Sequence, residues 1–174
     1  MLGTHWWNPP HQIPLVEVIK TEWTDSKVAD AMLALLISVG KQAVMVEKDV
    51  PGFIGNRLQH ALWREAISLV ENGICSAEAV DNVVKASFGR RLAVLGPLEN
   101  ADLVGIELTQ DIHNQVLFDL ETTPVPSDYL QRLLDEGKTG MAAGSGFREW
   151  SKDDLAQTKA RIASHLKQLE DILP

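Results

Sequence analysis

The sequence predicts a mainly α protein, in which the tail of an α/β sheet is followed by an all-helical domain. Two observations support this fold class. Short runs of β-branched residues suited to buried strands occur only in the N-terminal quarter, at residues 15–19 and 43–46. Beyond residue 50 such runs vanish, and apolar residues recur at the three- and four-residue spacing of helices. We therefore expect two domains, residues 1–50 and 51–174.

The N-terminal part is expected to form a strand, helix, strand unit. A helix beginning near Asp25 or Ser26 and ending at Gly40 separates the two strands, which we expect to lie parallel because a helix joins them. The predicted apolar face of this helix comprises Val28, Met32, Leu35, Leu36 and Val39. Two or three strands form an incomplete sheet with open edges. We therefore expect sequence upstream of this chain to have been lost or supplied separately.

The remaining residues are expected to form helices. Capping residues and prolines predict helices over 51–71, 76–87, 96–120 and 127–135, and a last one from Ser151 with an apolar stripe of Leu155, Ile162, Leu166, Leu169 and Leu173. Glycines make residues 137–146 a predicted loop.

Composition excludes several classes of function. A formal net charge of −8 argues against nucleic acid, which requires clustered Lys and Arg. The longest strongly apolar stretch, residues 31–37, is far shorter than the roughly 20 residues of a membrane span. The single cysteine, Cys75, fits a reducing compartment. We expect a protein of the cytoplasm or a similar compartment that binds neither nucleic acid nor membrane.

Glu17 is the residue that most requires a chemical explanation. It interrupts an aliphatic strand that should be buried, where an unpaired carboxylate is costly. Residues 3–7 form a possible neighbouring strand, and the Asn8-Pro9-Pro10 turn would bring His5 back toward Glu17. A carboxylate bonded to one imidazole nitrogen fixes the tautomer and stabilises the ring once the other nitrogen takes a proton. His5 and Glu17 are thus a candidate general base and its orienting group.

Two alternatives compete with that interpretation. Buried His–Glu pairs are more often structural than catalytic, so spacing alone favours a structural role. A metal site formed by His5, His11 and Glu17 is disfavoured, because the two histidines lie six positions apart across two prolines, which matches no common ligand spacing. We expect no metal.

Several motifs together change the balance between these alternatives. The blocks are Gly3-Thr4-His5-Trp6-Trp7-Asn8-Pro9, Leu15-Val16-Glu17-Val18-Ile19, Pro51-Gly52-Phe53-Ile54-Gly55-Asn56-Arg57, Gly96-Pro97-Leu98-Glu99, Asp102-Leu103-Val104-Gly105 and Gly144-Ser145-Gly146-Phe147. In order and spacing they resemble the signature of the 3-hydroxyacyl-CoA dehydrogenase family, over about the first 150 residues. The resemblance implies that the strands are remnants of a Rossmann-type sheet, and that the helical domain has the fold of the 6-phosphogluconate dehydrogenase C-terminal domain.

The resemblance also implies an activity and a site. The activity is hydride transfer between NAD and a secondary alcohol such as a 3-hydroxyacyl-CoA, as in the β-oxidation of fatty acids. His5 corresponds to the general base and Glu17 to the residue that holds it. Asn56 corresponds to the asparagine that touches the reacting oxygen, and Asn8 to the one that contacts the nicotinamide end of NAD. Family members pair through their helical domains, which implies a homodimer.

The chain departs from the family pattern at several positions. It has no Gly-x-Gly-x-x-Gly after a strand, so we expect residues 1–50 to be only the tail of the dinucleotide-binding domain, the part that grips NAD to be absent, and this fragment to be inactive alone. Trp6-Trp7 replaces the usual pair of phenylalanines. The cofactor-contacting lysine falls on Ala142, with Lys138 as a possible substitute.

Two further functions stay open. Residues 10–14 look more like the branch of the family that acts on small hydroxy compounds, which includes gulonate dehydrogenase, the lambda-crystallin relatives and a pyridine-ring alcohol dehydrogenase. The substrate is therefore an acyl-CoA or a small hydroxy or sugar acid. The long amphipathic helices are also compatible with a non-catalytic dimerisation module.

Overall fold

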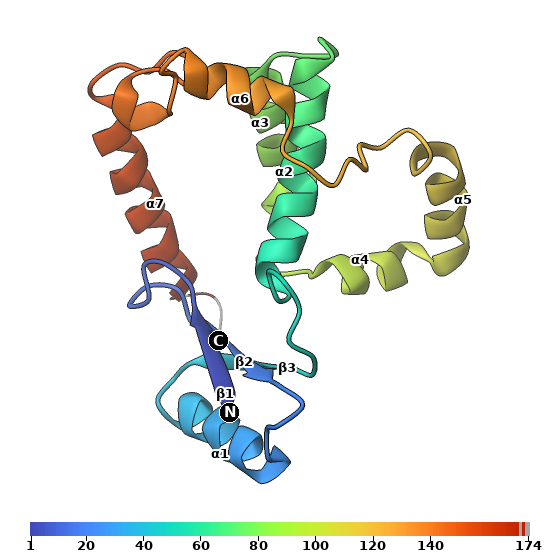
Figure 1. Ribbon diagram of the computed structural model, residues 1–174, viewed down its shortest axis with the longest axis vertical. Helices are drawn as coiled ribbons and strands as arrows, with labels where there is room; N and C mark the ends of the chain where they lie inside the picture. The colour runs from blue at the N-terminus through green and yellow to red at the C-terminus, as the bar shows by residue number, and fades with distance from the viewer. Residues whose placement is uncertain (171, 173–174) are drawn as a thin grey trace. The chain divides into compact units, whose positions relative to one another are not determined.

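The computed structural model describes residues 1–170 and 172, in which a small sheet precedes a series of helices (Figure 1). The elements are β1 (Leu2–Trp6), β2 (Leu15–Lys20), α1 (Ser26–Ser38), β3 (Gln42–Val46), α2 (Gly55–Glu71), α3 (Ala77–Ala86), the 3₁₀ turn η1 (Phe88–Arg90), α4 (Pro97–Val104), α5 (Ile106–Val116), α6 (Asp128–Asp135), the 3₁₀ turn η2 (Met141–Ala143) and α7 (Asp154–Glu170). The chain divides into two compact units, one formed mainly by Met1–Ala61 with the end of α7, and the other by Leu62–Arg161. The expected domain boundary after residue 50 stays a prediction.

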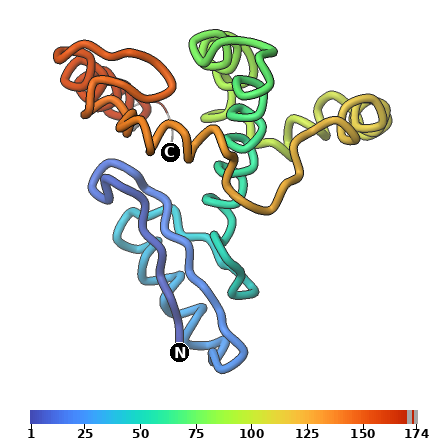
Figure 2. The backbone as a smooth tube through the Cα atoms, turned by 45° about the horizontal axis from the view of Figure 1, so that its top comes forward, coloured from blue at the N-terminus to red at the C-terminus, as the bar shows by residue number. Residues whose placement is uncertain are grey.

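The first unit is built on a three-stranded sheet in the order β1-β2-β3. β1 turns back into β2 as an antiparallel partner, and Figure 2 shows the two segments side by side. β2 and β3 are parallel, as expected for two strands joined through α1. The antiparallel register places His5 directly opposite Glu17, so the folding of the hairpin alone brings the two residues together.

Aliphatic side chains of β2 and α1 form the core of this unit. Val16, Val18 and Leu36 are buried, and Leu2, Met32, Leu33, Ala43 and Met45 pack against them. The expected face of α1 was therefore only partly right. Met32 and Leu36 face the core together with Ala29, whereas Val28, Leu35 and Val39 are exposed. Because the sheet is narrow, it covers only part of the apolar face of α1.

Most predicted helix ends are confirmed, because local side chains satisfy the free amides of the first turns. Asp25 caps α1 through the amide of Lys27, and Ser76 caps α3 through the amide of Ala79. Ser127 caps α6 in the same way. Gly40, at φ 82°, takes the left-handed conformation expected after α1.

Three predicted elements need correction. The helix expected from Pro51 begins four residues later, at Gly55. The long helix expected over 96–120 is two helices, because Gly105 at φ 101° breaks it between α4 and α5. The glycine-rich loop contains the turn η2. The predicted stripe position Leu173 lies outside the described residues.

Within residues 1–170, no helix combines the length and apolar character that a membrane crossing demands.

Two adjacent leucines of α1 provide a test of the packing of the first unit. Leu36 is 6% exposed and Leu35 is 56% exposed. Leu36→Ala leaves a cavity under the sheet and should lower the free energy of unfolding by about 2–4 kcal/mol, whereas Leu35→Ala should cost less than about 1 kcal/mol. Urea denaturation of both variants measures the difference. Equal losses would show that the sheet does not pack on the Leu36 side of α1.

Candidate active site

The centre of the candidate site is the hydrogen bond between His5 and Glu17. His5 Nδ1 lies 2.7 Å from Glu17 Oε2. Because an ionised carboxylate can only accept, Nδ1 carries the proton, which leaves the lone pair of Nε2 free in the neutral ring. The Glu17 side chain is only 1% exposed and that of His5 is 27% exposed. The contact expected from the sequence is therefore present, with the acid buried and the imidazole partly open.

The second carboxylate oxygen of Glu17 binds the beginning of α2. The backbone amides of Ile54 and Gly55 donate to Glu17 Oε1 over 2.8 Å and 3.1 Å. Amides in the first turn of a helix have no acceptor within the helix, and the helix dipole favours a negative charge at this end. Glu17 thus caps α2 from a neighbouring strand, which links the sheet to the helix.

The chain enters α2 through a strained turn. Gly52 and Phe53 have φ values of 79° and 49°, and such a value is uncommon for a residue that carries a side chain. This turn directly precedes the two amides that bind Glu17. It also explains why α2 starts later than its proline predicts, since residues 51–54 are used to turn the chain.

The environment of Glu17 favours its charged form. Burial by itself raises the pKa of this carboxyl, but the hydrogen bond with His5, the amides of Gly55 and Ile54, and the nearby Trp7 indole together outweigh it. The net result is a pKa below the ordinary value of 4.5. Glu17 is therefore an anion at neutral pH, held by donors on two sides.

Two aromatic rings enclose the imidazole. The centroid of His5 lies 5.2 Å from that of Phe53 and 6.0 Å from that of Trp7. These contacts and the Glu17 bond restrict rotation of the ring. The arrangement can take up a proton at Nε2 and keep the imidazole in one orientation while it does so.

The structure places the two candidate asparagines differently. Asn56 is the second residue of α2, next to Gly55, whose amide binds Glu17. Asn8 is exposed just beyond the end of β1, three residues after His5. The described part of the chain shows no side-chain hydrogen bond from either asparagine to His5 or Glu17. The hairpin therefore assembles the His–Glu pair, while Asn8 and Asn56 stay predicted contacts of bound molecules.

Some contributors to this site were not identified from the sequence. The amides of Ile54 and Gly55 and the ring of Phe53 belong to a sequence block that pointed only to Asn56. Backbone amides cannot be recognised from residue type, and nothing in the sequence indicated that the backbone of Phe53 has a left-handed conformation. Gly55 offered the clearest signal, because a glycine at a helix start permits close approach of another side chain.

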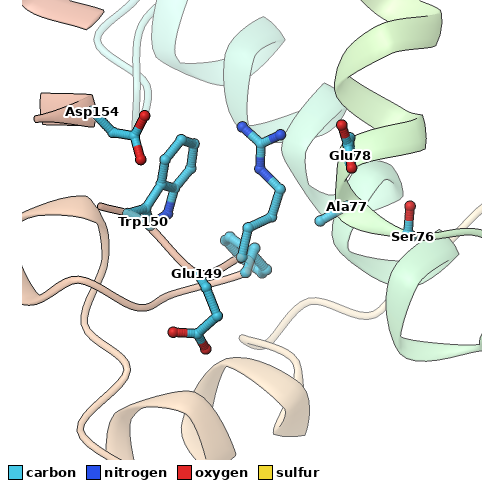
Figure 3. A pocket seen from close by; sticks show the side chains of 8 residues that line it. Ser76, Ala77, Glu78, Glu149, Trp150 and Asp154 are labelled. Carbon is cyan, nitrogen blue, oxygen red and sulfur yellow. The ribbon is translucent and has the colours of Figure 1, made fainter. Parts of the chain in front are cut away.

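A separate hollow of about 480 Å³ lies in the second unit (Figure 3). Ser76, Ala77 and Glu78 line one side of it, and Trp150 and Asp154 face them from the other. Arg148, which also lines it, forms an ion pair with Asp81 and stacks on the Trp150 ring. None of the predicted site residues lines this hollow. Among the described residues, no cluster of three or more His, Cys, Asp or Glu side chains suits a metal ion.

Comparison with known families assigns both parts of the chain. Residues 52–150 match the family model described as 3-hydroxyacyl-CoA dehydrogenase, C-terminal domain. Residues 1–50 match the model described as 3-hydroxyacyl-CoA dehydrogenase, NAD binding domain. The NAD-binding domain is therefore partly present in residues 1–50, in agreement with the expected tail of a dinucleotide-binding domain.

Individual relatives agree with this assignment. The chain is 35% identical over 97% of its length to 5-formyl-3-hydroxy-2-methylpyridine 4-carboxylate 5-dehydrogenase from Mesorhizobium japonicum, and it covers 54% of that protein. It is 37% identical over 85% of its length to the human mitochondrial hydroxyacyl-coenzyme A dehydrogenase, of which it covers 46%. The chain thus spans about half the length of these relatives.

Solved structures point the same way. The crystal structure of a 5-formyl-3-hydroxy-2-methylpyridine 4-carboxylic acid 5-dehydrogenase, described as an NAD⁺-dependent dismutase, matches 99% of this chain with a TM-score of 0.94 and 34% identity, and 56% of that protein is covered. A 3-hydroxyacyl-CoA dehydrogenase from Archaeoglobus fulgidus matches 97% of the chain with a TM-score of 0.59 and 31% identity, and 59% of it is covered. With the matched domains and the buried His–Glu pair, these similarities establish that the chain belongs to the 3-hydroxyacyl-CoA dehydrogenase family.

Proposed function

We propose that the protein containing this chain transfers hydride between NAD and a secondary alcohol, with His5 as the general base. The observation that carries the proposal is the bond between His5 Nδ1 and a buried glutamate that two amides of α2 hold in place. A merely structural pair would not require the second imidazole nitrogen to stay accessible. The His5 side chain is 27% exposed, and with the proton on Nδ1 its Nε2 is the nitrogen that can accept.

The proposed chemistry is the removal of two hydrogens from one alcohol. His5 Nε2 takes the hydroxyl proton while the carbon–hydrogen bond of the same carbon breaks with both of its electrons, and a carbonyl forms. NAD supplies the acceptor for that hydride. Glu17 stabilises the imidazolium that results, because its charge is fixed opposite Nδ1 before the reaction begins. In the reverse direction the imidazolium returns its proton to the carbonyl oxygen.

The chain offers only part of the contacts that NAD requires. Asn8 is exposed three residues beyond His5, which suits a polar contact with the nicotinamide end. Asn56 begins α2 beside Gly55, which suits a donor to the reacting oxygen. We assign the dinucleotide contacts to residues 1–50 and the substrate and dimer contacts to residues 51–174. This chain carries no glycine-rich phosphate loop, and we expect it to be inactive by itself.

Two substrate classes merit testing. A 3-hydroxyacyl-CoA is the first, and the match of residues 52–150 to the family's C-terminal domain supports it. The second is a small hydroxy or formyl compound. It is supported by the TM-score of 0.94 with the pyridine-carboxylate dehydrogenase, against 0.59 with the A. fulgidus enzyme.

We further propose a homodimer formed through the helical unit and a cytoplasmic location. Large apolar side chains lie exposed in and beside α4 and α5, including Leu98, Leu103, Ile106 and Phe118. Such surfaces are commonly covered by a partner. A role in β-oxidation follows only if the acyl-CoA substrate is the right one.

The first prediction concerns the proposed base. In the full-length protein, His5→Ala should lower kcat by about 10²–10⁴-fold, because the hydroxyl proton loses its acceptor. The measurement is NADH formation with NAD and a panel of 3-hydroxybutyryl-CoA, gulonate and the hydroxymethyl form of the pyridine carboxylate. His11→Ala, at an exposed position of the following loop, is the matched control and should keep wild-type kcat. Undiminished turnover by His5→Ala would refute the assignment of the base.

The second prediction concerns the charge of Glu17. Its pKa is lowered in the folded protein, so its stabilising contribution is complete above the ordinary value of 4.5 and is lost as pH falls through the lowered pKa. Glu17→Gln should lower the free energy of unfolding by about 2 kcal/mol at neutral pH. The difference from wild type should shrink in strongly acidic buffer.

This dependence is measured by urea denaturation of both proteins between about pH 2 and pH 7. These values lie on both sides of an ordinary carboxyl pKa. Glu22→Gln, at an exposed position of the same unit, is the control and should follow the wild-type curve. A stability difference that does not change with pH would show that Glu17 contributes packing rather than charge.

A further inference from the structure

The side chain of Trp7 has a buried polar atom that the proposed mechanism does not use. Its indole Nε1 is buried and has no hydrogen-bond partner among the described residues. A buried N–H without a partner costs free energy comparable to a lost hydrogen bond, so such groups are rare. The position of this atom therefore calls for an acceptor nearby.

The ring edge that carries Nε1 lies against the glycine that binds Glu17. A Cβ added to Gly55 would stand 2.3 Å from Cζ2 and 3.1 Å from Cε2 of Trp7, and Cε2 is bonded to Nε1. The amide of the same glycine donates to Glu17 Oε1. Gly55 thus lets the indole lie against the backbone whose amide binds Glu17, where a side chain would clash with it.

Glu17 has one acceptor position left. A carboxylate offers about four lone-pair positions on its two oxygens. Ile54 and Gly55 occupy two of them on Oε1, and His5 occupies one on Oε2. The remaining position on Oε2 is the natural acceptor for a fourth donor.

We propose that Trp7 is a positioning residue whose indole N–H donates to Glu17 Oε2, so that four donors fix the carboxylate that orients His5. This inference rests on the proposed function of His5 for its catalytic consequence, but the contact itself can be tested independently. Trp7 suits the role because its N–H is always a donor, whatever the pH. A phenylalanine at this position would fill similar space without the donor.

The electrostatics of Glu17 agree with a fourth donor. Burial raises the pKa of Glu17, and proximity to the Trp7 indole is among the contacts that lower it. Of the groups in contact with Glu17 that change its pKa, His5 is the titratable one, and the others are backbone amides and this indole.

Trp6 provides a matched control next to Trp7 in the chain. It is the last residue of β1 and is 42% exposed, with its indole donating to Thr4 Oγ1 over 3.2 Å, whereas Trp7 follows the strand and has a buried indole nitrogen. Trp6→Phe and Trp7→Phe therefore make the same chemical change at an exposed and at a buried indole.

The contact is tested by ¹⁵N–¹H NMR of the indole groups in the full-length protein with NAD bound. The indole resonances are assigned through the two Trp→Phe variants or by triple-resonance spectra of the wild type. In Glu17→Gln the Trp7 indole proton should move upfield and exchange with solvent faster, while that of Trp6 stays in place. A Trp7 resonance that is indifferent to Glu17→Gln would overturn the proposal, whether or not Trp7→Phe folds.

The catalytic consequence is tested by the pH profile of kcat/KM. Trp7→Phe should lower kcat/KM by about threefold to tenfold, with the loss of activity on the acid side occurring at higher pH than in wild type and in Trp6→Phe. If the kcat/KM profile of Trp7→Phe loses activity at the same acidic pH as wild type while the NMR contact is present, Trp7 does not position Glu17 for catalysis and the bond is only structural. If the wild type oxidises no substrate of the panel, the proposed function fails while the NMR result still decides the contact.

Discussion

The site depends on one constraint, which is that a carboxylate without water must be surrounded by hydrogen-bond donors. Glu17 meets this constraint with donors from separate parts of the chain, an imidazole from β1 and two amides from the beginning of α2. The same bonds that stabilise the charge therefore hold the hairpin against the helix. The packing of the hairpin on α2 and the orientation of His5 therefore have a common origin in Glu17.

This arrangement places His5 where the sheet meets the beginning of α2. The sheet sets His5 opposite Glu17, and the strained turn at Gly52 and Phe53 leads into the two amides that bind Glu17 and places the Phe53 ring beside the imidazole. Strain in the backbone is tolerated where surrounding contacts determine it, and here Glu17 provides such contacts on the α2 side. In this member of the 3-hydroxyacyl-CoA dehydrogenase family, the imidazole of His5 is thus oriented by contacts within the chain itself.

Much of the fold was predictable because its signals are local. Capping by Asp25, Ser76 and Ser127, and the left-handed Gly40, depend on a few adjacent residues, and the structure confirms them. Predictions failed where distant contacts compete with local preference. Pro51 marks a turn rather than a helix start because Glu17 captures the amides of the following residues, and the break at Gly105 depends on a backbone conformation that the apolar periodicity does not reveal.

By itself, the sequence determined that Glu17 is buried, that His5 is its partner and that the two belong to a hairpin, because an aliphatic strand and a proline turn leave few other solutions. Only the tertiary structure decided which further donors complete the shell around Glu17. Backbone amides and the edge of an indole ring have no signature in residue order, since their positions follow from how α2 meets the sheet. The burial of Glu17 and its pairing with His5 thus follow from the local sequence, whereas the remaining hydrogen-bond donors around Glu17 follow from tertiary packing.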